Sequence, residues 1–331
     1  MSQSMSVPPP AWGGDAPTPE SVITSIETWL RNEPLATLVD AFGGRVPHES
    51  AAGTLKWLDD FSAEHWDFRV GQERNLARTA DFDRATTDLI LNTAAALGLT
   101  TSTPPARNAY DHVLILGGLV RACLLRPRFA AGLIERGLQT RSVAALSAYR
   151  PLRGDEHDLI NALGVPDKRN EMEVMEAGLV EAFALGKPDD EQAYDEPGLE
   201  FATSLVRTWQ ASGLRIQLVI APSPEPATRR ANTADTYAYW ADSCAHLTTG
   251  NSILLVTSSI YVPYQHADAV RLLALPHGCS VETVGIDFSD ERLGALQQSF
   301  TPANYLQEIR SAIRATRALY AAASVAEEAA Y

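Results

Sequence analysis

Three short stretches of the chain place glycine, hydroxyl or amide groups at points where a ligand can reach them. The apolar run 112–116 continues into Gly117-Gly118, and the run 252–256 continues into Thr257-Ser258. Asn232-Thr233 stand where a helix is expected to begin. Backbone N–H groups of glycine and side-chain hydroxyls bind the polar groups of ligands, so we predict a ligand crevice at the ends of these runs.

Two further residues are expected at the same crevice. Ser147 ends the apolar run 142–147 and offers a hydroxyl group there. Arg121 follows the glycines and can supply a charge for a phosphate or carboxylate. A tight turn at the glycines and a merely hydrophilic strand end at Ser147 remain alternative readings.

Three residues are candidates for acid–base chemistry. Asp235 or Glu171 would act as general base, and Tyr261 as proton donor or orienting group. Both carboxylates also have structural explanations. Glu171 lies in the first turn of an expected helix, where a negative charge complements the helix dipole, and Asp235 suits a capping box opened by Asn232.

These residues need strands and helices to position them, and the chain from residue 107 onward alternates the two. Apolar runs predict strands at 112–116, 142–147, 215–220, 252–257 and 281–286. Helical spacing predicts helices at 127–137, 171–185, 198–212, 232–247, 264–274 and about 302–328. This alternation predicts an α/β fold with a mainly parallel sheet that helices cover on both faces.

Three regions follow from these patterns. Residues 1–19, rich in Ser, Pro and Gly, are expected to be a disordered leader. Residues 20–105 form a helical region that ends at Pro104-Pro105, and residues 106–331 form the α/β domain with its C-terminal helix. The long segments 150–170 and 186–198 are lids or solvated surface loops.

Composition excludes several classes of partner. A net charge of −14 disfavours nucleic acid and anionic membrane surfaces. The 3 cysteines are widely spaced and His residues lack ligand spacing, so neither a disulfide framework nor a metal site is expected. No secretory signal or bilayer-spanning run is present, which indicates a cytoplasmic protein with a small-molecule partner. Assembly into a homodimer is left open.

Several standard motifs are missing from the sequence. We find no G-x-G-x-x-G after a strand, no P-loop, no H-E-x-x-H and no G-x-S-x-G. The ligand and the reaction therefore have to be inferred from the crevice residues.

The order of the crevice motifs resembles the YdcF-like family, domain of unknown function 218, which includes the ElyC and SanA envelope proteins. The resemblance rests on Leu116-Gly117-Gly118, on Ser147, on Glu171 with Met175, on 232–236 and on Val256-Thr257-Ser258. It covers roughly residues 110–287. The chain has Tyr261 and Tyr264 where the family has His and Arg, which puts chemistry that needs those residues in doubt.

The resemblance implies a Rossmann-like, three-layer α/β/α fold and S-adenosylmethionine as ligand. The leading hypothesis is thus an enzyme, a transferase rather than a hydrolase, that binds S-adenosylmethionine or a nucleotide. A hydrolase or transferase acting on a phosphorylated or glycan-lipid substrate is the second, with Arg121, Arg150 and Arg153 on the anion. A non-catalytic binding or scaffold protein is the third.

Overall fold

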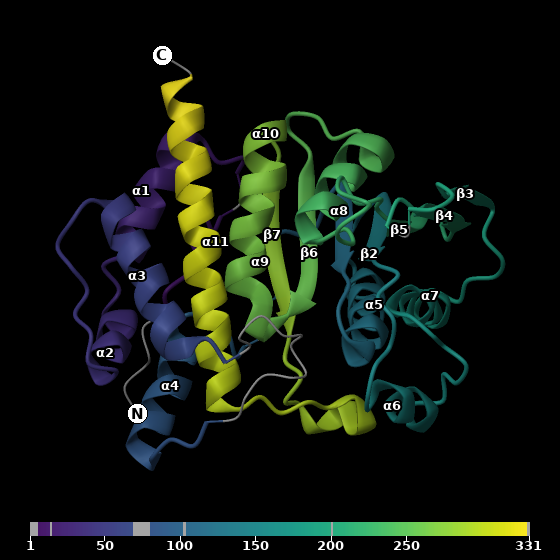
Figure 1. Ribbon diagram of the computed structural model, residues 1–331. Helices are drawn as coiled ribbons and strands as arrows, with labels where there is room; N and C mark the ends of the chain where they lie inside the picture. Colours follow the sequence, from purple (N-terminus) through teal and green to yellow (C-terminus); the bar gives the residue numbers. More distant parts are fainter. Residues whose placement is uncertain (1–5, 14, 69–79, 102–103, 200, 330–331) are drawn as a thin grey trace.

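The computed structural model describes residues 6–13, 15–68, 80–101, 104–199 and 201–329. Within these ranges, four helices precede the first strand: α1 (Pro19–Trp29), α2 (Glu33–Ala41), α3 (Ala51–Trp66) and α4 (Arg84–Ala96). The chain then alternates strands and helices and ends in the 27-residue helix α11 (Pro302–Glu328), as Figure 1 shows. The predicted N-terminal helical region is confirmed.

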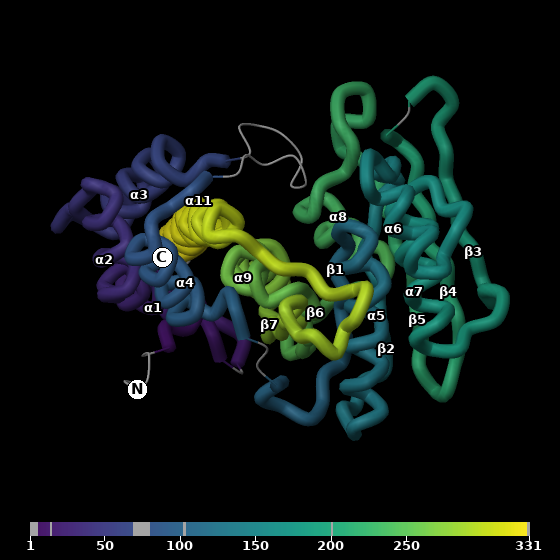
Figure 2. The backbone as a smooth tube through the Cα atoms, turned by 90° about the horizontal axis from the view of Figure 1, so that it is seen from below, coloured from purple at the N-terminus to yellow at the C-terminus, as the bar shows by residue number. Residues whose placement is uncertain are grey.

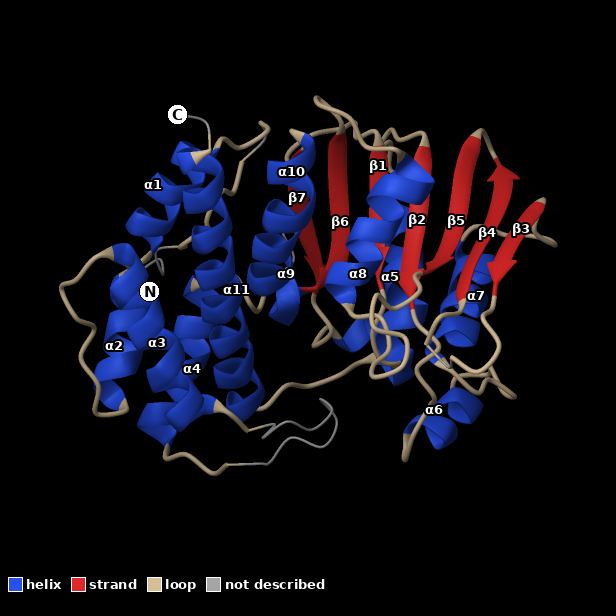
Figure 3. Cartoon of the chain, turned by 45° about the horizontal axis from the view of Figure 1, so that its top comes forward, coloured by secondary structure: helices blue, strands red, loops and turns tan. Residues whose placement is uncertain are grey.

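The described strands form one seven-stranded sheet in the order β3-β4-β5-β2-β1-β6-β7. They are β1 (His112–Leu116), β2 (Ser142–Ser147), β3 (Asp190–Tyr194), β4 (Ser204–Ala211), β5 (Leu214–Ile220), β6 (Ser252–Ser258) and β7 (Ser280–Ile286). Strands β5, β2, β1, β6 and β7 are parallel, whereas β4 and β3 add an antiparallel edge (Figure 3). The predicted α/β fold with a mostly parallel sheet is confirmed.

Helices cover both faces of the sheet because successive strand residues point to opposite sides. Val113 and Ile115 of β1 share a core with α5 (Val120–Glu135) and α7 (Glu171–Ala182). Leu114 and Leu116 pack on the other face. The elements there are α8 (Thr233–Tyr239), its π-helical continuation η2 (Trp240–Ala245), α9 (Val262–Ala269) and the π-helix η4 (Val270–Ala274). The parallel strands, which are buried on both faces, read as nearly continuous apolar runs.

Four short helices complete the described structure. They are α6 (Glu156–Ala162), the 3-10 helix η3 (Ser259–Tyr261), α10 (Leu275–His277) and the 3-10 helix η5 (Glu291–Leu296). Of these, η3 follows β6 directly, and α6 lies between β2 and α7. Both therefore stand near the carboxyl ends of the parallel strands.

The N-terminal helices share a core with the C-terminal helix. Trp29, Leu38 and Leu58 pack with Ile309 and Ile313 of α11. Seen from below, α11 lies between α1–α4 and α9 (Figure 2). The helical region is thus attached to the sheet through a helix more than 200 residues away in sequence.

One predicted helix is wrong. Residues 198–212 were expected to be helical, but 204–211 form strand β4, which pairs antiparallel with β5. The connection is Ser212-Gly213, with φ of 53° and 79°. Two successive positive φ values are typical of the two-residue hairpin turn that joins twisted antiparallel strands. The hairpin therefore prevails over the helical spacing of the apolar residues that precede it. The acidic segment expected as a loop supplies β3, an exposed edge strand.

The described part of the expected disordered leader is packed against the rest of the chain. Pro9 and Pro10 are buried, and the Ala11 N–H donates to Ser25 Oγ at 2.8 Å. Trp12 lies 4.9 Å, ring to ring, from His266 of α9. Residues 1–5 and 14, also within the expected leader, lie outside the described residues.

Candidate functional site at the β1–β6 crevice

The strand order changes direction at β1. From β1 the chain passes through α5 to β2 on one side, whereas β6, on the other side of β1, is reached from β5 through α8. Helices that leave neighbouring strands in opposite directions open a crevice at the carboxyl ends of those strands. The β1–β6 boundary is therefore where this fold can hold a ligand.

A cavity of about 410 Å³ opens at that boundary. Its volume is in the range of small-molecule sites. Among the described residues that line it are eight of the predicted ones, namely Gly117, Gly118, Ser147, Glu171, Asn232, Thr233, Ser258 and Tyr261. Arg121 lines a smaller, adjoining cavity, and neither Asp235 nor Thr257 lines the main one.

The two glycines are required because neighbouring atoms come too close for a side chain. A Cβ on Gly117 would lie 2.7 Å from the Leu146 carbonyl oxygen and would collide with the Glu171 carboxylate. A Cβ on Gly118 would lie 2.9 Å from the Ala122 Cβ. Glycine thus lets the ends of β1 and β2 and the start of α7 converge on the cavity.

Arg126, on α5, forms part of the cavity lining and is fully buried. Its Nη1 donates to the Leu116 carbonyl oxygen at 2.6 Å and also to that of Gly117, and its Nη2 donates to Ser258 Oγ at 2.9 Å. The guanidinium also lies 5.9 Å from the centre of the Tyr261 ring. A fixed positive charge therefore stands at the crevice between β1 and β6.

Sequence reasoning missed Arg126. The residue stands within an unbroken buried segment of α5, 122–127, where a charged side chain is rarely placed without partners. An arginine inside the otherwise apolar stretch 122–127, after the glycine pair, was the signal available in the sequence.

A buried chain of charges surrounds Glu171. Its carboxylate accepts from Arg150 Nε at 3.0 Å and from Ser147 Oγ at 3.4 Å, and Arg150 also binds Glu156 through two bonds of 2.8 and 2.9 Å. Burial raises the pKa of Glu171 above its usual range, and the charge of Arg150 offsets this only in part. A carboxyl group of this kind at a cavity is suited to accepting a proton.

Glu156 is held differently. Burial would raise the pKa of its carboxyl, but hydrogen bonds from Arg150 and from the backbone N–H groups of Arg153 and Val120 outweigh burial and lower it. Val120 is the first residue of α5. The positive end of that helix thus already holds a carboxylate from the chain itself.

The start of α8 forms a capping box, as the structural explanation of Asp235 predicted. Asn232 Oδ1 accepts from the N–H groups of Ala234 and Asp235 at 2.8 and 3.2 Å, and the Asp235 carboxylate accepts from the Asn232 N–H at 2.8 Å. Arg229 donates to the same carboxylate at 2.6 Å. Asp235 is therefore engaged in holding the helix start, while Asn232 and Thr233 line the cavity.

The end of β6 separates its two hydroxyl residues. Ser258 lines the cavity and accepts from Arg126, whereas Thr257 is fully buried and donates to the Gln265 side chain. The Tyr261 and Tyr264 rings, 6.1 Å apart and nearly perpendicular, form an aromatic wall. The strand thus presents one hydroxyl and two rings to a ligand.

The described ranges contain neither a metal-binding cluster nor a helix suited to a membrane. There, no group of three or more His, Cys, Asp or Glu side chains is placed to hold a metal ion. Over the same ranges, no helix has the length and apolar character that crossing a bilayer demands.

Comparison with known proteins places the chain in a family. Residues 13–98 match the model of the Rv3785 N-terminal domain. The uncharacterized proteins Rv3785 of Mycobacterium tuberculosis (strain ATCC 25618 / H37Rv) and Mb3814 of Mycobacterium bovis are each 35% identical to this chain, over 92% of it and 90% of their own length. No solved structure gives a significant match.

These matches overturn the resemblance to the YdcF-like family. The motifs that suggested it are short segments at strand ends, and the geometry of any open α/β crevice favours glycine and hydroxyl residues there. A relative that matches nearly the whole chain outweighs them. The chain belongs to the Rv3785 family.

Proposed function

We propose that the protein is an enzyme that binds a nucleotide in the β1–β6 crevice and uses it in a group-transfer reaction. The observation that carries the proposal is the position of Arg126. A fully buried guanidinium bridges the ends of β1 and β6 at the lining of the main cavity. Arginine at such a position is suited to a phosphate or carboxylate group.

The strand order supports a nucleotide. When the five parallel strands are numbered 1 to 5 along the chain, their spatial order β5-β2-β1-β6-β7 becomes 3-2-1-4-5. This is the strand order of the Rossmann-like fold, which binds nucleotides at the same switch point. Tyr261, Tyr264 and Phe288 give the cavity aromatic surface for a base. A volume of about 410 Å³ suits a mononucleotide.

The charge of the cavity favours a nucleotide over S-adenosylmethionine. The described lining includes four arginines and a single carboxylate, Glu171. Arg150 and Arg229 are already paired with carboxylates, so the excess positive charge comes from Arg126 and Arg230. The sulfonium of S-adenosylmethionine is positive and would be repelled, whereas phosphate would be attracted. Glu156 already occupies the start of α5, so we place the phosphate near Arg126 and Arg230 rather than at that helix.

Glu171 is our candidate for the general base. Burial raises its pKa, and Arg150 and Ser147 hold its carboxylate in a fixed orientation. Positioning of two bound substrates can supply much of the acceleration in a transfer reaction. A serine hydrolase is disfavoured because none of the described lining residues is a histidine that could activate Ser147 or Ser258.

A thermal-shift screen tests the proposal. The panel contains AMP, ADP, ATP, GMP, S-adenosylmethionine and S-adenosylhomocysteine. We expect a nucleotide to raise the melting temperature by an amount that grows with its concentration. The shift should fall sharply in Arg230→Gln, at the cavity rim, and persist in Arg84→Gln, whose side chain is 96% exposed on α4.

Two outcomes would count against the proposal. A shift with S-adenosylmethionine and none with nucleotides would reverse the ligand assignment. No shift with any compound would favour a non-catalytic protein.

A further inference from the structure

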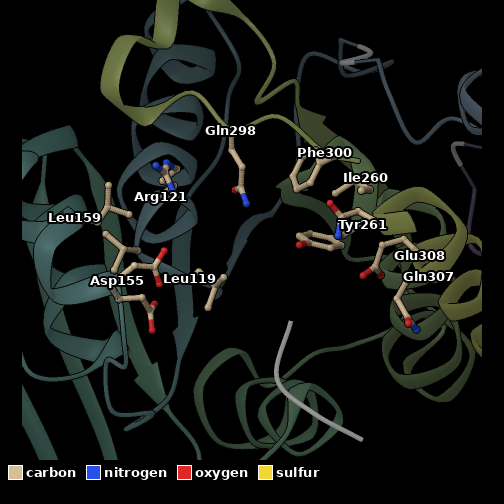
Figure 4. A pocket seen from close by; sticks show the side chains of 13 residues that line it. Leu119, Arg121, Asp155, Leu159, Ile260, Tyr261, Gln298, Phe300, Gln307 and Glu308 are labelled. Atoms are coloured by element: carbon tan, nitrogen blue, oxygen red, sulfur yellow. The ribbon is translucent and has the colours of Figure 1, made fainter. Parts of the chain in front are cut away.

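The start of α5 stands at the junction of two cavities. Leu119, the residue before the helix, lines both the main cavity and a smaller one of about 120 Å³. Figure 4 shows Leu119 and Arg121 at this helix start, beside Asp155 and Leu159 of the segment that carries α6. In folds with this strand order, the N–H groups at the start of the helix after β1 usually hold the pyrophosphate of a ligand. Because the Leu119 side chain has no acceptor, it cannot cap these N–H groups.

Glu156 supplies an acceptor from within the chain. It is the first residue of α6, between β2 and α7, and is only 3% exposed. Burial would raise the pKa of its carboxyl, but hydrogen bonds from Arg150 and from the N–H groups of Arg153 and Val120 outweigh burial and lower the pKa. The carboxylate is therefore ionised at neutral pH, and it lies at the first N–H of α5.

Arg150 holds this carboxylate in place. Its Nη1 and Nη2 donate to the two oxygens of Glu156 at 2.9 and 2.8 Å, and the Arg153 N–H donates at 3.2 Å. A bidentate pair of this kind fixes the orientation of the carboxylate as well as its distance. A ligand anion can therefore reach the start of α5 only by breaking a buried ion pair, which is costly.

The same helix start lies next to the proposed phosphate site. Arg126 donates to the Gly117 carbonyl oxygen, and Gly117 precedes Leu119 by two residues. A second phosphate attached to one at Arg126 would find its N–H donors at the start of α5. Glu156 already stands there, and two anionic groups repel each other strongly at such short range.

We infer that the crevice selects a nucleotide with a single phosphate group and that Glu156 excludes a second phosphate. The inference rests on the proposed function and narrows its ligand to a nucleoside monophosphate. The Glu156 carboxylate takes the place of the β-phosphate of a diphosphate, while the single phosphate lies with Arg126 and Arg230. Triphosphates, and dinucleotides joined through a pyrophosphate, are excluded for the same reason.

Calorimetric titration of AMP and ADP into the full-length protein tests the inference. We expect the wild type to bind AMP at least about tenfold more tightly than ADP. Glu156→Gln keeps the size of the side chain but removes its charge, so ADP should bind at least about fivefold more tightly than to the wild type. AMP affinity should change less than about twofold in this variant. Asp155→Asn removes the same charge from the neighbouring, exposed position and should leave the ratio of the two affinities unchanged.

A second variant keeps the test decisive if Glu156→Gln is unstable. Glu156→Asp retains the charge that pairs with Arg150 but draws the carboxylate back from the Val120 N–H, so ADP affinity should again rise. The inference is overturned if ADP binds the wild type as tightly as AMP does, if neither Glu156 variant changes the ratio, or if Asp155→Asn changes it equally. Each of these outcomes leaves nucleotide binding intact. If neither nucleotide binds the wild type, the proposed function itself fails, and this inference fails with it.

Discussion

Arg126 and Ser258 join the two sides of the switch point. The Arg126 Nη2 lies 2.9 Å from Ser258 Oγ, so a side chain from the helix that follows β1 is bonded to the last residue of β6. The same guanidinium holds the carbonyl groups of Leu116 and Gly117. The crevice therefore has a rigid cationic contact that spans both strands, and a ligand anion placed there would meet charge without reorganisation.

Gly117→Ala should destabilise the protein and distort the site. The added Cβ would lie 2.7 Å from the Leu146 carbonyl oxygen and collide with the Glu171 carboxylate, so the ends of β1 and β2 must separate. We expect a loss of about 1–3 kcal/mol in the free energy of unfolding, measured with urea. Gly186→Ala is the matched control because no atom lies within 4 Å of its added Cβ. Equal stability of the two variants would contradict this reading of Gly117.

Arg150→Met should be among the most damaging single changes in the chain. It leaves the carboxylates of Glu171 and Glu156 buried without their shared cation. Removing one partner of a buried ion pair costs about 3–5 kcal/mol. Arg128→Met breaks an exposed pair with Glu181 and should cost less than about 1 kcal/mol. Chemical denaturation of both variants gives the comparison, and similar losses would mean that the buried network contributes little.

Asp235→Ala separates a structural role from a catalytic one. The substitution removes half of the capping box and one of the two carboxylates that bind Arg229, so we expect a loss of about 1–2 kcal/mol in unfolding free energy. Nucleotide affinity should change less than about twofold, because Asp235 does not line the cavity. Glu171→Gln removes the candidate general base. This variant should bind nucleotide with similar affinity, but it should show no turnover in an assay of the transfer reaction. Loss of turnover in Asp235→Ala without loss of stability would restore Asp235 as the base.

His266 should make the protein sensitive to acid. Burial lowers its pKa to about 4, well below the value of 6.5 for an exposed histidine. Between pH 6.5 and 4 the unfolded chain therefore binds a proton that the folded chain does not, and stability falls as the pH falls through this window. At the acid end of this window, near pH 4, His266 should have lowered the free energy of unfolding by about 3 kcal/mol.

The measurement is the difference in unfolding free energy between wild type and His266→Gln at pH 7 and at pH 4.5. We expect the wild type to lose more stability than the variant over this range. His48→Gln, at an exposed position, should follow the wild type at both values. Parallel curves for all three proteins would show that His266 does not titrate abnormally.

The parallel strands could be predicted from the sequence because a strand that is buried on both faces needs apolar residues at successive positions. Strands β1 and β2 match their predicted ranges, and β5, β6 and β7 differ by a single residue. Strand β4 could not be found this way. Its residues are also compatible with a helix. They form a strand because they pair with β5 across the turn at Ser212 and Gly213, where both φ angles are positive.

The site shows the same division. Gly117, Ser147 and Ser258 stand at the ends of predicted strands, so their convergence follows from the parallel sheet. Arg126 was missed, and Arg150 was expected on a ligand anion but instead pairs with Glu156 and Glu171. Neither role could be predicted, because each depends on a side chain that crosses from a helix or a loop to distant partners. The link between α11 and the N-terminal helices is likewise a long-range contact that no local pattern specifies.

Calorimetric titration of AMP, ADP and S-adenosylmethionine into the wild type and Arg126→Met tests the central claim most directly. Loss of a charged hydrogen bond of about 1.5–3 kcal/mol predicts that AMP or ADP binds at least about tenfold more weakly to Arg126→Met. Affinity should be unchanged in Arg128→Met, and Ser258→Ala provides a second crevice variant should Arg126→Met be unstable. Nucleotide binding that is equal in wild type and in the crevice variants, or absent from the wild type, would contradict the account.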